Sequence, residues 1–260
     1  NQESFSVVYG GHATYVRAYP ISVDFDEIRE IVSTPEQELT VAELINQVGL
    51  AGQKIIFGVD RIDYTKGIPE RFLAIDRFFE KYPEFKGKAV FLQMGVVSRI
   101  HLNEYKKLNE ELNILAEQIN WKHSTGTWSP ILFVRRQLSF QEVLSFYSLA
   151  DVCLVSSLHD GMNLVAKEFV AAAGSKKGML VLSRFTGAAR ELTDAVLINP
   201  YDRENFSDGI YQALTMIEPE RRERMERMQR VLMENNVYQW AGKIVTEMLD
   251  INYRRQGPSQ

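Results

Sequence analysis

The chain has 260 residues, of which 45% are hydrophobic and 25% charged, and its 30 Lys and Arg against 34 Asp and Glu give a formal net charge of −4. This is the composition of a globular protein, long enough for one large domain or two small ones. A mildly acidic chain without a long basic run argues against binding to nucleic acid or to anionic membranes, because both depend on clustered positive charge.

Cysteine usage and hydrophobic runs indicate an intracellular protein, which we expect to be cytoplasmic. Cys153 is the single cysteine, so it cannot form an intramolecular disulfide, and no Cys/His spacing typical of structural zinc is present. No apolar run approaches the roughly 20 residues that span a bilayer. The sequence starts at Asn1 rather than Met, as in a piece of a longer protein.

Residues 1–50 do not complete a domain of their own. Two short β-like runs, at 5–8 and 14–18, are followed by Pro20 and by a helix-like stretch over 24–32. We therefore expect residues 1–50 to be a remnant of, or a linker from, an N-terminal domain.

From about residue 51 to 240 the chain alternates short apolar runs with amphipathic helical patterns, which is typical of parallel βαβ units. Helix signals include Pro69 in a first turn and a capping box of Ser139 and Glu142. The predicted strands are 54–59, 89–94, 131–134, 152–155, 179–182 and 196–198. The expected fold class is α/β, a doubly wound parallel sheet over 51–240, with a C-terminal helix and tail over 241–260.

In such a sheet ligands bind beyond the carboxyl ends of the strands, so the loops that follow the predicted strands are the candidate site. The loop 59–67 carries two cations five residues apart, Arg61 and Lys66, which suit a diphosphate. It has neither a Walker A sequence nor a GxGxxG motif, so side chains would neutralise the phosphates. The alternative is a solvated loop with an Arg–Asp pair.

The loop 156–163 leads directly into a predicted helix, where free N–H groups and the helix dipole favour an anion. Gly161 allows close approach of a ligand, and Asp160 and Asn163 suit sugar hydroxyls or simple helix capping. Glu168 lies about one turn inside this helix and is predicted to point towards the same mouth, the alternative being a surface glutamate. Arg99, just after the second predicted strand, is a further candidate for phosphate. No histidine spacing indicates a metal.

Taken together, these loops resemble the C-terminal half of the trehalose-6-phosphate synthases, a family of retaining glycosyltransferases with the two-Rossmann GT-B architecture. The similarity runs from about residue 50 to 250, although the family usually has Gly where this chain has Ser22. The matching stretches are Gly58–Gly67, Trp128–Ile131, Asp160–Glu168 and Asn199–Asp202.

The resemblance implies that residues 51–240 form a Rossmann-like donor domain. Arg61 and Lys66 would then be the catalytic cations that hold the diphosphate of UDP-glucose and stabilise the leaving UDP, with no cofactor and no metal ion. Glu168 would bind the ribose hydroxyls, and Arg99 would reach the acceptor phosphate. The remaining donor-binding residues would be Asp160, Gly161, Met162, Asn163 and Leu164.

The implied reaction transfers glucose from UDP-glucose to glucose 6-phosphate and yields trehalose 6-phosphate and UDP. The family's N-terminal Rossmann domain, which carries most of the acceptor site, has no counterpart in these residues, so we expect the fragment alone to be inactive. The alternatives are a glucosylglycerol-phosphate synthase-like enzyme, with another acceptor, and a catalytically silent sugar-nucleotide-binding module.

Overall fold

A six-stranded parallel sheet forms the centre of the computed structural model, which describes residues 6–34, 52–96, 102–173 and 178–256. Its strands are β3 (Lys54–Arg61), β4 (Ala89–Val96), β5 (Ile131–Val134), β6 (Val152–Val155), β7 (Met179–Ser183) and β8 (Val196–Ile198). All six predicted strands are present in the order β5-β4-β3-β6-β7-β8, every neighbouring pair being parallel. The strand order reverses between β3 and β6, so the loops after these two strands flank the switch point.

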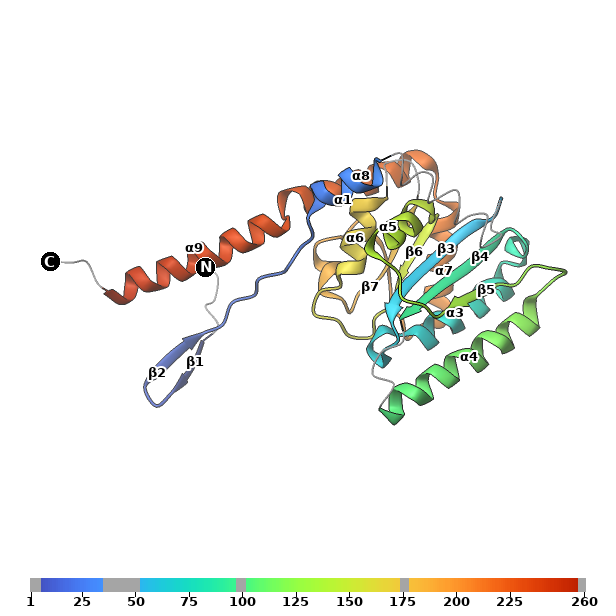
Figure 1. Ribbon diagram of the computed structural model, residues 1–260, viewed down its shortest axis with the longest axis horizontal. Helices are drawn as coiled ribbons and strands as arrows, with labels where there is room; N and C mark the ends of the chain where they lie inside the picture. The colour runs from blue at the N-terminus through green and yellow to red at the C-terminus, as the bar shows by residue number, and fades with distance from the viewer. Residues whose placement is uncertain (1–5, 35–51, 97–101, 174–177, 257–260) are drawn as a thin grey trace.

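Helices cover both faces of this sheet (Figure 1). On one face α3 packs against α4 and α7, and on the other α1, α5, α6 and α8 pack against one another. Their bounds are α1 (Phe25–Val32), α3 (Ile68–Lys81), α4 (Asn103–His123), α5 (Phe140–Leu149), α6 (Leu164–Ala172), α7 (Arg203–Thr215) and α8 (Glu218–Glu234). The predicted capping box is confirmed at α5, where Ser139 and Glu142 exchange side-chain and backbone hydrogen bonds.

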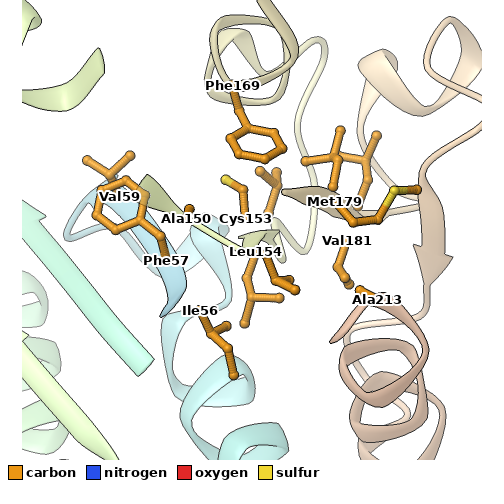
Figure 2. Packing of buried hydrophobic residues seen from close by; sticks show 14 of the residues in the cluster. Ile56, Phe57, Val59, Ala150, Cys153, Leu154, Phe169, Met179, Val181 and Ala213 are labelled. Carbon is orange, nitrogen blue, oxygen red and sulfur yellow. The ribbon is translucent and has the colours of Figure 1, made fainter. Parts of the chain in front are cut away.

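The core lies on both sides of the sheet because the central strands are apolar on both faces. Figure 2 shows Cys153 of β6 beneath Phe169 of α6, while Val181 of β7 points towards Ala213 of α7 on the opposite side. Cys153 is fully buried, and burial raises the pKa of its thiol. A protonated, enclosed thiol is an inert core residue, as its place in an apolar strand predicts.

Two elements extend away from the sheet (Figure 1): a hairpin of β1 (Ser6–Tyr9) and β2 (His12–Tyr15), and the long helix α9 (Val237–Gln256). The segment that leads from the hairpin to α1 is tied to α9, since Trp240 donates its indole N–H to the Tyr19 carbonyl over 3.1 Å. It is also tied to α6 by the fully buried Lys167, whose Nζ lies 2.9 Å from the Ile21 carbonyl. None of the helices in the described ranges is long and apolar enough to cross a membrane.

Candidate functional site

The two loops singled out in the sequence meet at the switch point. The first follows β3 and contains the short 3-10 helix η1 (Tyr64–Lys66), while the second runs from the end of β6 to α6. The backbone N–H of Leu158 donates to the Thr65 carbonyl over 2.8 Å. A side-chain link lies beside it, because the Lys66 ammonium is 2.7 Å from the Asp160 carboxylate. Residues 94 positions apart in sequence thus form one site.

The charged side chains of Lys66 and Asp160 are mostly buried, with 19% and 18% of their surface exposed. Burial acts to raise the pKa of Asp160, but the hydrogen bond and charge of Lys66 and the backbone N–H of Met162 outweigh it and hold that pKa below its ordinary value. The carboxylate therefore stays ionised near neutral pH. An ammonium has three donors, so Lys66 can bind Asp160 and still present a proton to a ligand.

Arg61 ends β3 on the same edge of the sheet and is exposed. Within the part of the chain that the structure describes, its guanidinium has no hydrogen-bond or ion-pair partner. It is therefore a cation available to a ligand at the mouth of the site. The predicted phosphate residue Arg99 lies outside the described residues.

Asn163 caps α6, as one interpretation of the sequence predicts. Its side-chain oxygen accepts from the N–H of Ala166 over 3.0 Å, and its φ of +86° is a conformation that Asn tolerates better than most residues. Its amide also donates to Asp160 over 3.2 Å, so the cap and the Lys66 pair are connected. Asp160 accepts from the Met162 N–H within its own loop and does not cap the helix.

Glu168 is partly buried in the second turn of α6, so the alternative of a simple surface glutamate is wrong. Its carboxylate accepts a hydrogen bond of 3.2 Å from the hydroxyl of Tyr147, a fully buried residue of α5. Burial raises the pKa of Glu168, although the Tyr147 hydroxyl works against this rise. The sequence analysis did not identify Tyr147 as a residue of the site. Its position three residues after Leu144 on an apolar helix face was the available signal, because a buried tyrosine hydroxyl needs a partner.

An open pocket of about 650 Å³ adjoins the second loop and is lined by Asp160, Gly161 and Met162 together with Arg184 and Arg190. Leu164, the first residue of α6, follows the second loop directly in sequence and is 36% exposed. The described residues contain no group of three or more His, Cys, Asp or Glu side chains arranged to hold a metal ion. The charged lining of the pocket combines Arg184 and Arg190 with the carboxylates of Asp160 and Glu191, and neither Arg61 nor Lys66 is among the residues that line it.

Gly67 ends the first loop, where both its backbone conformation and a close backbone contact disfavour a side chain. Its φ is +60°, and a Cβ there would lie 2.4 Å from the Ser156 carbonyl oxygen. Gly67→Ala is expected to lower the free energy of unfolding by about 1–2 kcal/mol for the positive φ, and by about 1–3 kcal/mol more for the backbone clash.

Gly126→Ala is the matched control, because Gly126 has a φ of +59° with nothing within 4 Å of the added Cβ. Chemical denaturation of both variants measures the difference. Equal losses of stability would contradict the close contact between the two loops.

Comparison with known proteins places this site in a family. The model of glycosyltransferase family 20 matches residues 1–250. An α,α-trehalose-phosphate synthase (UDP-forming) of Pichia angusta is 39% identical over 242 residues, which cover 93% of this chain and 51% of the relative. The chain spans about half the length of the curated relatives it matches.

Two solved structures have the same fold. An α,α-trehalose-phosphate synthase (UDP-forming) from Burkholderia xenovorans in complex with glucose-6-phosphate gives a TM-score of 0.91 at 34% identity, covering 96% of this chain and 55% of that one. An E. coli structure with bound UDP-2-fluoro glucose gives a TM-score of 0.87 at 35% identity, covering 94% and 55%. With a family model that extends over residues 1–250, the chain belongs to glycosyltransferase family 20.

Proposed function

We propose that this chain is the UDP-glucose-binding half of a retaining glucosyltransferase that transfers glucose to glucose 6-phosphate and releases trehalose 6-phosphate and UDP. The observation that carries this proposal is the Lys66–Asp160 pair at the switch point of a doubly wound sheet, with the exposed Arg61 at the end of β3 in the same loop as Lys66. Relatives in the same family are UDP-forming trehalose-phosphate synthases. One structural neighbour was solved with a UDP-glucose analogue and another with glucose 6-phosphate.

In this proposal Arg61 and Lys66 neutralise the donor diphosphate. Charge accumulates on the leaving UDP as its bond to glucose breaks, and preorganised cations lower the free energy of that transition state. The backbone N–H groups at the start of α6 add to this field. Two side-chain cations and a helix terminus supply the countercharge, so the proposed site needs no metal ion.

The other contacts follow from where the second loop lies. Asp160 and Asn163, with the backbone of Gly161, Met162 and Leu164, would meet the glucose hydroxyls and the diphosphate. Glu168, oriented by Tyr147, would accept hydrogen bonds from the ribose hydroxyls.

We propose that most of the acceptor side of the cleft lies outside residues 1–260, since the chain covers only 51% of its Pichia angusta relative. We propose residues 51–240 as the donor domain, 1–50 as the connection to a second Rossmann domain, and 241–260 as the terminal helix and tail. Arg99 is proposed to contact the acceptor phosphate.

Calorimetry of UDP and UDP-glucose binding in the presence of EDTA tests this function. We expect both ligands to bind, with affinities that magnesium and manganese leave unchanged, because Arg61 and Lys66 provide the positive charge. Binding that appears only when one of these metals is added would overturn the metal-free site.

The pKa of Glu168 predicts a pH dependence. Burial holds this pKa above its ordinary value of 4.5, so the carboxylate takes up its proton at a higher pH than an exposed glutamate does. A protonated carboxyl accepts ribose hydroxyls poorly, and uridine affinity should therefore fall as the pH is lowered towards 4.5 from above. Asp160 stays ionised in this range because its pKa lies below 3.8.

Titration of uridine affinity against pH, with Glu168→Gln as the comparison, checks this expectation. The variant should bind uridine more weakly at neutral pH and show no such fall. An unchanged pH dependence in the variant would assign the titration to another group.

A further inference from the structure

A fully buried arginine lies directly beneath the two loops. Arg71, in the first turns of α3, is 0% exposed, and its guanidinium donates to three partners. The distances are 2.8 Å to Asp60 of β3, 2.7 Å to Gln93 of β4 and 2.9 Å to the hydroxyl of Ser156, which follows β6. Arg71 thus joins the two strands at the switch point to the neighbouring strand β4.

The network continues into the first loop. The Ser156 hydroxyl accepts from Arg71 and lies 2.9 Å from the Gly67 carbonyl and 3.1 Å from that of Lys66. The Gly67 carbonyl also accepts the backbone N–H of Arg71 over 3.0 Å. Ser156 therefore connects the buried guanidinium to the backbone of the proposed phosphate-binding lysine.

A gain in folding stability does not by itself account for this buried hydrogen-bond network around Arg71. A buried ion pair loses much of its Coulomb gain to desolvation, and well-packed apolar residues are often as good or better. Strand β3 leaves space for the arginine side chain at Gly58, because a Cβ at that position would lie 2.5 Å from Nη1 of Arg71. What the arginine does provide is a fixed geometry, because its planar fork engages three elements at once.

We propose that Ser156, whose hydroxyl is fixed by Arg71, is a positioning residue: it holds the Lys66–Gly67 turn against the β6 loop and so places the Lys66 ammonium for the donor diphosphate. This inference rests on the proposed donor site. Lys66 is a flexible side chain, and the position of its charge depends on how firmly its backbone is held. Uridine contacts that do not involve Lys66 should be insensitive to this support.

A double-mutant cycle in the 260-residue chain tests the proposal, with UDP and uridine affinities measured by calorimetry. Ser156→Ala should weaken UDP binding about two- to tenfold, the range for one lost hydrogen bond, and leave uridine binding unchanged. In a Lys66→Ala background the same substitution should have no further effect on UDP. Ser207→Ala, which removes another fully buried hydroxyl bonded to the Glu204 carbonyl, is the matched control and should change neither affinity.

Two results would overturn the inference: equal losses of UDP and uridine affinity, or a UDP loss that persists when Lys66 is alanine. If Ser156→Ala does not fold, Ser156→Cys keeps the volume with a weaker hydrogen-bonding group and is expected to show the same selective loss. If Lys66→Ala itself leaves UDP affinity unchanged, the donor site fails together with this inference. If Lys66→Ala weakens UDP while Ser156→Ala has no effect, only the positioning role fails.

Discussion

Replacing Lys66 with alanine should weaken UDP binding about tenfold to a hundredfold, which corresponds to roughly 1.5–3 kcal/mol for a charge-assisted hydrogen bond in a partly desolvated site. Uridine binding should change much less, because uridine has no phosphate for the ammonium to contact. Arg61→Ala should have the same selective effect, since its guanidinium is exposed at the same edge of the sheet. Glu168→Gln should instead weaken both ligands, because its proposed contact is to the ribose.

Calorimetry with UDP and uridine on each variant measures this selectivity. Lys88→Ala is a matched control, because Lys88 is an exposed lysine just before β4, at the opposite edge of the sheet. It should change neither affinity. Equal losses of UDP and uridine affinity in Arg61→Ala or Lys66→Ala would show that the cation concerned does not contact phosphate.

The central strands β3, β4, β6 and β7 could be predicted from the sequence because they are buried on both faces and therefore read as short apolar runs. The edge strands β5 and β8 are partly exposed, but they too are short apolar runs in the sequence. The two β-like runs near the N-terminus were predicted less accurately, and their pairing as a hairpin was not predicted. Its second strand, expected over 14–18, spans His12–Tyr15, because the two-residue turn at Gly10 and Gly11 brings the chain straight back. Two adjacent glycines with positive φ are the usual signal for such a turn.

Within the site, residue types and their place at strand ends predicted which loops would meet. The partners inside the site could not be predicted in this way, because they depend on contacts between residues far apart in sequence. The alternative of a solvated loop with an Arg–Asp pair shows this: an Arg–Asp pair is present, but it joins Asp60 to Arg71 and is buried. Arg71 was detectable in principle, since it shares a helix face with Ile68 and Ile75.

The chain alone is expected to form no detectable trehalose 6-phosphate from UDP-glucose and glucose 6-phosphate, although it should fold and bind the donor. In the proposed enzyme the donor half stabilises the leaving UDP, while the other half orients the acceptor hydroxyl. Orienting two reactants can lower a barrier by roughly 7–11 kcal/mol. Loss of that contribution should therefore abolish measurable turnover, and Arg99 cannot compensate, because one arginine attracts a phosphate without fixing the position of a hydroxyl.

An assay of UDP release with glucose 6-phosphate as acceptor tests this expectation, first with the chain alone and then with the N-terminal half of a family relative expressed separately. The Lys66→Ala variant of the chain is the control for the second measurement, since it should reduce any restored turnover. Acceptor-dependent turnover by the chain alone would contradict the proposal that the other half orients the acceptor, because it would require a complete acceptor site within residues 1–260. Turnover restored by the added half, and lowered by Lys66→Ala, would assign leaving-group stabilisation to the switch-point cations and acceptor positioning to the other half.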